Sequence, residues 1–221
     1  MEIYKQVKYF FEKQYWVFLL IISFISYGQT LWMQVWRDTN AIFFKFNHLN
    51  EPAGYLGRGL LGEGTYKFSV TPYWFIYKLV GYKYIFPYYL LNLIFYFIAS
   101  FFVYRLFTKL ISKKSGRIAG FLFAAGYIAT EGFLSLDSSM IFNISIILIC
   151  LSLIFYKKFS VSNKLKDFLF SLFWYLFAVF LTPVRVHYFI GVIVLFDIFW
   201  IWKFNFKKIH YLFLRAQCLG S

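Results

Sequence analysis

The stretch PYYLLNLIFYFIASFFVYRLFT, at residues 87–108, decides the fold class of this chain. It is apolar or aromatic almost throughout, and it is as long as the roughly 20 residues that an α-helix needs to cross the hydrocarbon core of a bilayer. Five more apolar runs lie along the chain, at residues 15–36, 118–135, 139–156, 167–183 and 187–202. The sequence therefore predicts an all-α, polytopic membrane helix bundle with about six transmembrane helices.

The composition of the chain agrees with a membrane protein. Apolar residues make up 61% of it and charged residues only 14%, whereas about a quarter of the residues of a soluble domain are charged. The net charge of +14 would point to nucleic acid in a soluble protein. Here the apolar runs exclude a soluble nucleic-acid binder, and the basic residues lie mostly in short clusters between those runs.

The basic clusters predict how the chain is oriented. The connectors near residues 131–139 and 183–187 carry only Arg185 as a fixed positive charge, while the alternate connectors are rich in Lys and Arg. Because basic connectors stay in the cytoplasm, both termini are expected there, in a multi-pass protein of a bacterial or archaeal plasma membrane. The cytoplasmic basic residues are Lys5, Lys8, Lys13, Lys109, Lys113, Lys114, Arg117, Lys157, Lys158, Lys164, Lys166, Lys203, Lys207, Lys208 and Arg215.

The loop between the first two runs, residues 37–86, is then expected on the outer side of a single transmembrane domain that covers residues 1–221. Apolar spacing predicts a short helix over residues 39–49. A second short helix is expected to begin at Thr71-Pro72 and to end at Gly81. Both helices are too short to span a bilayer, so they are expected to lie in the outer interface.

Two carboxylates on the outer side are candidate catalytic residues. Asp38 directly follows the first apolar run, and Glu131 lies at the next outer turn. If the bundle brings them together, they could act as a general base or hold a divalent cation. The alternative for Asp38 is a helix N-cap at the interface. Glu131 could instead cap a helix end or face water.

Four outer residues are candidates for binding a phosphate. Arg58 lies in a glycine-rich stretch and Lys67 follows it, at the depth of anionic lipid headgroups. The alternative for this stretch is a plain flexible turn. Arg185 and His187 stand in the third outer turn, where a positive charge is disfavoured and needs a reason. Binding a phosphate is one reason, and snorkelling of the side chain to the interface is the other.

The order of these features resembles the GT-C superfamily of membrane glycosyltransferases, which includes protein mannosyltransferases and aminoarabinose transferases. The residues that carry the resemblance are Trp36-Arg-Asp-Thr-Asn-Ala-Ile-Phe-Phe-Lys45, the glycine-rich stretch 54–64 with Thr71-Pro72-Tyr73, and Gly126-Tyr-Ile-Ala-Thr-Glu-Gly132. Family members have an acidic pair after the first helix, where this chain has Arg37-Asp38, and they are longer. An apolar stretch restarts at Tyr211, which predicts that this chain is the N-terminal portion of a longer protein.

The resemblance implies a site and a substrate. Asp38 would be the base that activates the acceptor, and Glu131 would assist it. Arg58, Lys67 or Arg185 would face the phosphate of the donor, a sugar linked to a polyprenyl phosphate. The alternative is a non-enzymatic multi-span protein, such as a transporter, a flippase or an assembly subunit, which would place its polar residues inside the bundle.

Overall fold

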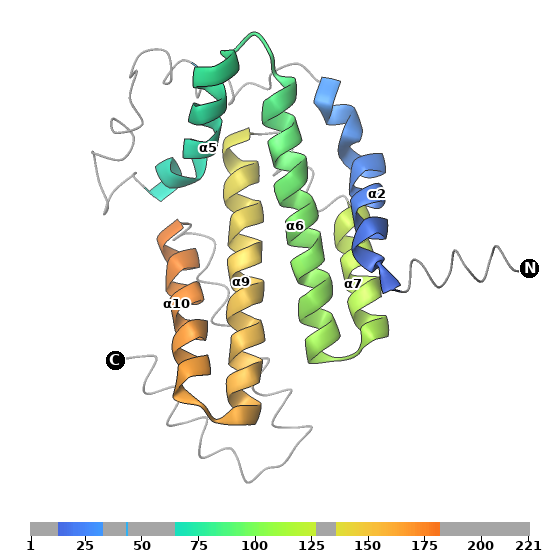
Figure 1. Cartoon of the computed structure of the whole chain (residues 1–221), viewed down its shortest axis with the longest axis vertical. Coiled ribbons are helices and arrows are strands. Elements are labelled where there is room, and N and C mark those ends of the chain that lie inside the picture. The colour runs from blue at the N-terminus through green and yellow to red at the C-terminus, as the bar shows by residue number, and fades with distance from the viewer. Residues whose placement is uncertain (1–12, 33–42, 44–64, 127–135, 182–221) are drawn as a thin grey trace, which may run out of the picture. The chain divides into compact units, whose positions relative to one another are not determined.

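The computed structural model describes residues 13–32, 43, 65–126 and 136–181, and every structural statement below refers to these residues (Figure 1). They belong to one compact unit, residues 1–182. All regular elements of this described part are helices, as the sequence predicts. In chain order they are α2 (Tyr15–Tyr27), the 3-10 helix η1 (Gly28–Trp32), α5 (Thr65–Val80), α6 (Phe86–Leu110), α7 (Lys113–Ala125), α9 (Leu136–Ser162) and α10 (Leu165–Leu181).

Three of the described helices are long and apolar enough to cross a bilayer. They are α2 continued by η1, over Tyr15–Trp32, then α6, and the part of α9 over Ser139–Ser162. These segments match the apolar runs at 15–36, 87–108 and 139–156, so the prediction of an integral membrane protein is supported. The sixth run lies outside the described residues, and the total of six spans stays a prediction.

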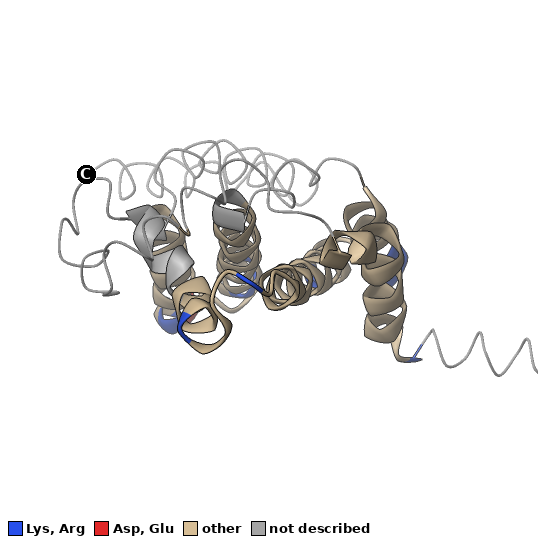
Figure 2. Ribbon diagram, turned by 90° about the horizontal axis from the view of Figure 1, so that it is seen from above, with Lys and Arg blue, Asp and Glu red and all other residues tan. Residues whose placement is uncertain are grey.

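Helix α6 lies at the centre of the packing. It contacts α2, η1, α5, α7 and α9, while α9 also contacts α5 and α10. Figure 2 looks down on these helices and shows them side by side. With 25 residues, α6 is about 37 Å long, which exceeds the roughly 30 Å of the hydrocarbon core. Its neighbours on both sides are therefore held along a helix that can cross the whole membrane.

Helix α7 approaches α6 closely through a row of small residues. Gly116, Gly120 and Ala124 recur every four residues and are buried. A Cβ atom added at Gly116 would lie 2.7 Å from the carbonyl oxygen of Tyr104 and 2.8 Å from the amide nitrogen of Thr108. Because both atoms belong to the backbone of α6, the two helices can adopt this distance only with glycine at position 116.

The second short helix predicted in the outer loop begins earlier than expected. Helix α5 starts at Thr65, so Pro72 lies inside it rather than at its first position. The fixed φ of proline is compatible with a helix, but proline there removes one backbone hydrogen bond and its ring crowds the carbonyl four residues earlier. The predicted end is confirmed: Gly81 has φ +65, and its N–H donates to the carbonyl of Tyr77 over 2.8 Å. Thr65–Val80 packs against α6, α9 and α10.

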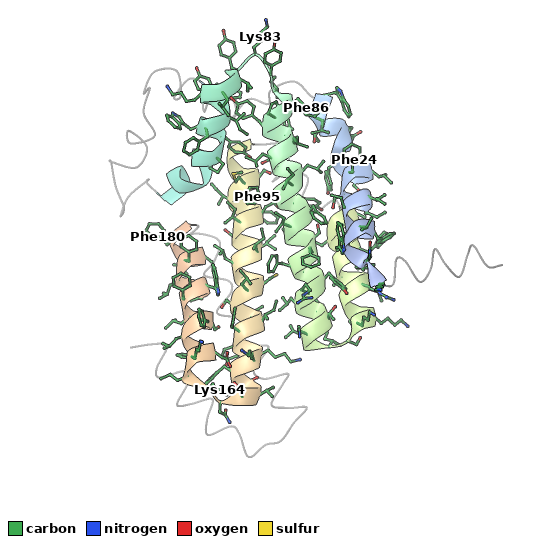
Figure 3. All side chains as sticks on the ribbon, viewed as in Figure 1. Phe24, Lys83, Phe86, Phe95, Lys164 and Phe180 are labelled. Atoms are coloured by element: carbon green, nitrogen blue, oxygen red, sulfur yellow. The ribbon has the colours of Figure 1, made fainter. Side chains whose placement is uncertain are left out.

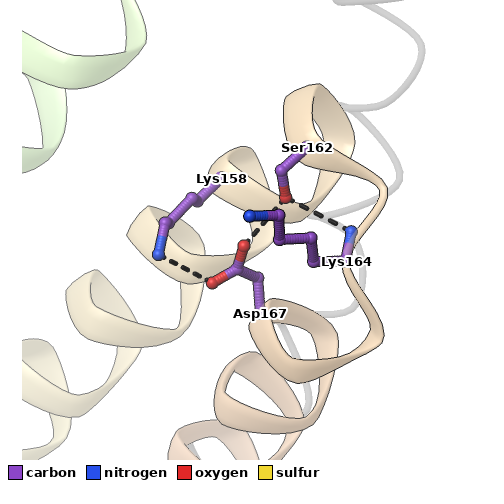
Figure 4. Close-up of polar contacts among 4 residues, drawn as sticks. All are labelled: Lys158, Ser162, Lys164 and Asp167. Carbon is purple, nitrogen blue, oxygen red and sulfur yellow. Dashed lines mark hydrogen bonds and ion pairs between the residues drawn. The ribbon is translucent and has the colours of Figure 1, made fainter.

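The α9–α10 turn is held by a small polar cluster (Figure 4). Asn163 adopts φ 53, a left-handed conformation that Asn tolerates better than most residues. The Lys158 ammonium lies 2.8 Å from one oxygen of Asp167, and the Ser162 hydroxyl donates to the other over 2.8 Å.

Deeper in the hairpin, the Ser152 and Ser171 hydroxyls each donate to the carbonyl of the other residue, over 3.0 and 2.9 Å.

The stability of this hairpin is expected to fall in acid. Hydrogen bonds from Lys158 and then Ser162 hold the pKa of Asp167 below its ordinary value of 3.8. The carboxylate is therefore favoured in the folded state. Its contribution to the free energy of unfolding is present above the unfolded pKa and is lost as the pH falls through the lower, folded pKa. Thermal unfolding from about pH 6 down to about pH 2 should show a larger acid-dependent loss of stability in the wild type than in Asp167→Asn. Identical profiles would contradict a stabilising role for this cluster.

Candidate functional site

Five buried tyrosines form a cluster toward the end of the bundle where α6 begins. Tyr27, Tyr73, Tyr88, Tyr89 and Tyr96 are at most 6% exposed, and they pack with Leu31, Phe43, Leu93 and Met140. We call these five residues the tyrosine cluster. Its tyrosines come from α2, α5 and α6, and Leu31 and Met140 connect it to η1 and α9. The Phe43 ring, from the first loop, packs edge-on against Tyr88 at 5.0 Å between ring centroids. The segment between η1 and α5 thus contributes at least this residue to the core.

Four hydroxyls of the tyrosine cluster donate hydrogen bonds to acceptors within the protein. Tyr88 donates to the carbonyl of Gly81 over 3.0 Å, and Tyr73 donates to the side-chain oxygen of Asn92. Tyr27 donates to the carbonyl of Gly126 over 2.5 Å, and Tyr96 to that of Phe123. A buried phenol needs such an acceptor. These four hydroxyls therefore hold backbone and side chains in place.

Two of these bonds serve the C-terminal end of α7. This helix has 13 residues, so it is about 20 Å long and covers only part of the roughly 30 Å hydrocarbon core. The apolar run at 118–135 predicted a helix that continues further. The last carbonyls of a helix have no partner within it, and in a membrane they cannot bind water. Tyr96 and Tyr27 supply hydroxyl donors to Phe123 and Gly126 at this end.

Removing one of these hydroxyls is expected to destabilise the bundle. Tyr96→Phe keeps the ring, which is 0% exposed, and leaves the carbonyl of Phe123 without its donor. An unsatisfied buried acceptor costs about 1–3 kcal/mol. Denaturant unfolding in detergent should show a loss of this size. The control is Tyr82→Phe, because the Tyr82 side chain is 67% exposed; an equal loss in both variants would contradict the role of Tyr96.

Buried polar side chains lie within the three apolar helices. Ser23 of α2, Asn92 of α6, and Ser139 and Asn143 of α9 are at most 1% exposed. Among the described residues, the hydroxyls of both serines, the amide nitrogen of Asn92 and the amide oxygen of Asn143 have no hydrogen-bond partner. Such atoms are costly to bury, and polar side chains inside spans often mark a functional path. None of these side chains is among the site residues predicted from the sequence, although an isolated Asn within an apolar run is a visible signal.

Basic side chains lie at the end of the unit that is opposite to the tyrosine cluster. The α6–α7 and α9–α10 turns lie together there, and the α5–α6 turn with Lys83 lies at the other end, as the labels of Lys164 and Lys83 show (Figures 1 and 3). The ammonium of Lys157 in α9 donates to the carbonyls of Lys109 and, over 3.2 Å, Leu110 at the end of α6. Lys157 thereby connects the two basic turns. It also supplies a hydrogen-bond donor to carbonyls at the end of α6, which have no partner within the helix.

The described residues include one of the predicted site residues. Lys67 lies in the first turn of α5, and its side chain is not described. The remaining candidates lie outside the described residues, so their approach to one another stays a prediction: Asp38, Arg58, Glu131, Arg185 and His187. Within the described part of the chain, no group of three His, Cys, Asp or Glu residues could hold a metal ion.

Comparison with known proteins gives no relative. The sequence matches no family model, no curated protein and no solved structure. The class that the described helices define is a helical membrane protein.

Proposed function

We propose that this chain is a membrane glycosyltransferase that transfers a sugar from a polyprenyl-phosphate-linked donor to an acceptor on the outer face of the membrane. The proposal rests on the resemblance of residues 36–45 and 126–132 to the GT-C superfamily. Asp38 is the base that activates the acceptor, and Glu131 assists it. Arg58, Lys67, Arg185 and His187 face the phosphate of the donor.

One structural observation supports the location of this site. The basic α6–α7 and α9–α10 turns share one end of the unit, and Lys157 connects them. Basic ends of membrane helices stay in the cytoplasm, so the other end faces outward. Asp38 follows the end of η1 at Trp32 by six residues, and Glu131 follows Gly126 by five. Both carboxylates are therefore close in sequence to helix ends that lie away from the basic turns.

The chemistry suits that face. A sugar on a polyprenyl phosphate carries its leaving group with it, so the outer surface needs no nucleotide. A carboxylate can take the proton from the acceptor hydroxyl as the new glycosidic bond forms. The bond between the sugar and the phosphate oxygen breaks, and the lipid phosphate leaves with the electron pair. Arginine and lysine stabilise that charge by hydrogen bonds to the phosphate oxygens.

A transfer assay tests the proposal. Membranes that contain the protein are incubated with a polyprenyl-phosphate sugar labelled in the sugar, and label is followed out of the lipid-extractable fraction. Transfer is expected in membranes with the chain and not in matched membranes without it. Label that stays in the lipid fraction in both preparations would contradict the activity of this chain.

The second candidate is a non-enzymatic multi-span protein, which the buried Asn92, Ser139 and Asn143 favour. A transporter places polar groups inside its bundle, and these side chains lie within apolar helices that pack together. The substitution Asn143→Leu separates the two functions, because it removes the buried amide. A transporter is expected to lose solute exchange in Asn143→Leu vesicles. A glycosyltransferase is expected to keep sugar transfer per folded molecule.

A further inference from the structure

The basic turns form one surface with almost no negative charge. Eight side chains of the α6–α7 and α9–α10 regions belong to it: Lys109, Lys113, Lys114, Arg117, Lys157, Lys158, Lys164 and Lys166. We call them the basic face. Among the side chains described in these two regions, Asp167 is the one carboxylate, and it is paired with Lys158. Lys113, Lys114, Lys164 and Lys166 are exposed, so the charge of this surface is largely uncompensated within the described unit.

The two halves of the basic face are fixed to each other. The Lys157 ammonium bonds the carbonyls of Lys109 and Leu110, which end α6. This bond joins residues 48 positions apart and holds the α9–α10 turn against the α6–α7 turn. The cations of the two turns therefore act on the same neighbouring surface.

The N-terminus of α7 adds to the positive potential. The hydroxyl of Ser112 caps this helix by accepting the N–H of Ser115 over 3.1 Å. Lys113, Lys114 and Arg117 follow, and the first turn has no acidic residue. A helix N-terminus carries a partial positive charge, so lysines there are unfavourable unless an anion is near. The charge pattern opposes isolated folding of α7 and favours an anionic neighbour.

Exposed apolar side chains on the same turns identify the kind of neighbour. Ile111 is 63% exposed, Val161 69% and Leu165 67%. They stand between the lysines at the ends of membrane helices. At a bilayer surface such side chains enter the boundary of the acyl chains, while ammonium groups reach the phosphates. A soluble anion would leave these apolar side chains in water.

We infer that the basic face binds the phosphate headgroups of anionic phospholipids in the leaflet at this end of the bundle. The lysines supply the charge, α7 supplies the helix N-terminus, and Ile111, Val161 and Leu165 contact the lipid chains. The inference depends on the membrane assignment and is independent of the proposed transferase activity. It predicts that the lysines of the basic face contribute more to the preference for anionic phospholipid than the exposed Lys78 and Lys83 near the α5–α6 turn.

Matched pairs of lysines test this inference. The full chain is reconstituted in phosphatidylcholine bilayers with a minor fraction of phosphatidylglycerol, and the association of spin-labelled phosphatidylglycerol is compared with that of spin-labelled phosphatidylcholine. Each lysine near a membrane surface contributes about 1 kcal/mol, so Lys113→Gln with Lys114→Gln should lower the preference by about fivefold to thirtyfold. Lys78→Gln with Lys83→Gln, exposed and near the α5–α6 turn, should leave it nearly unchanged.

A charge-conserving pair controls for folding. Lys113→Arg with Lys114→Arg keeps the positive charge and should keep the preference for phosphatidylglycerol. An unchanged preference after the Gln substitutions at 113 and 114 would overturn the inference. An equal fall in the 78/83 pair would also overturn it, because net charge alone would then explain the association.

Discussion

Replacing Gly116 by leucine is expected to separate α7 from α6 and to lower the free energy of unfolding by more than about 3 kcal/mol. A Cβ atom at this position would lie 2.7 Å from the Tyr104 carbonyl oxygen and 2.8 Å from the Thr108 amide nitrogen. Neither atom can rotate away, because both are backbone atoms of α6. The smaller change Gly116→Ala should cost about 1–3 kcal/mol. Denaturant unfolding in detergent measures both losses.

The control for this prediction is another position on α7. Leu122 is 62% exposed, so Leu122→Ala should change the free energy of unfolding by less than about 1 kcal/mol. If Gly116→Leu unfolds at the same denaturant concentration as the wild type, the close approach of α6 and α7 is wrong. If both variants lose the same stability, general damage to α7 explains the result and the backbone contact does not.

Replacing Asp38 by asparagine is expected to lower the rate of sugar transfer by about 10²–10⁴-fold. The amide keeps the size of the side chain and cannot accept the acceptor's proton. Initial rates in the labelled-donor assay, normalised to the amount of folded protein, measure the effect. The matched control is Asp167→Asn, the same chemical change in the α9–α10 turn. It should alter acid stability and leave the transfer rate near that of the wild type.

The outcome separates the role of Asp38 from the activity itself. Undiminished transfer by Asp38→Asn would remove this residue from the mechanism while leaving the transferase function intact. An equal loss in Asp38→Asn and Asp167→Asn would assign the effect to folding. Because Asp38 has a second interpretation as a helix N-cap, unfolding of Asp38→Asn should be measured alongside. Asparagine caps a helix about as well as aspartate, so a residue that acts only as a cap would leave both the stability and the rate per folded molecule of Asp38→Asn nearly unchanged, whereas Asp38→Ala would lose about 1 kcal/mol of stability.

Much of the helix pattern could be predicted from hydropathy. The run at 87–108 corresponds to α6 over Phe86–Leu110, since few polar residues interrupt it and Pro87 favours a helix start. The early end of α7 at Ala125 could not be read in the same way, because the apolar residues continue through it. The helix ends at Gly126, whose backbone is extended at φ −76 and ψ 141, and the hydroxyls of Tyr27 and Tyr96 that bind carbonyls at this end come from other helices.

The polar contacts of the core were less predictable for a different reason. Tyr27 and Gly126 are 99 residues apart, and Tyr96 and Phe123 are 27 apart. No local pattern encodes these pairs, since they depend on which helices become neighbours. For the predicted Asp38 and Glu131, short motifs suggest a chemistry, but a distance between them follows only from tertiary structure.

The contact of Lys157 with the end of α6 has a consequence for how the protein is made. The α6–α7 pair and the α9–α10 pair are each sequence-local hairpins, which can form soon after their residues enter the membrane. The bond from Lys157 to the carbonyls of Lys109 and Leu110 joins one hairpin to the other. It cannot form until the ribosome has released almost the whole of α9. The two hairpins would therefore be joined during synthesis at the end of the bundle that carries the basic turns, when this lysine binds the last turn of a helix inserted earlier.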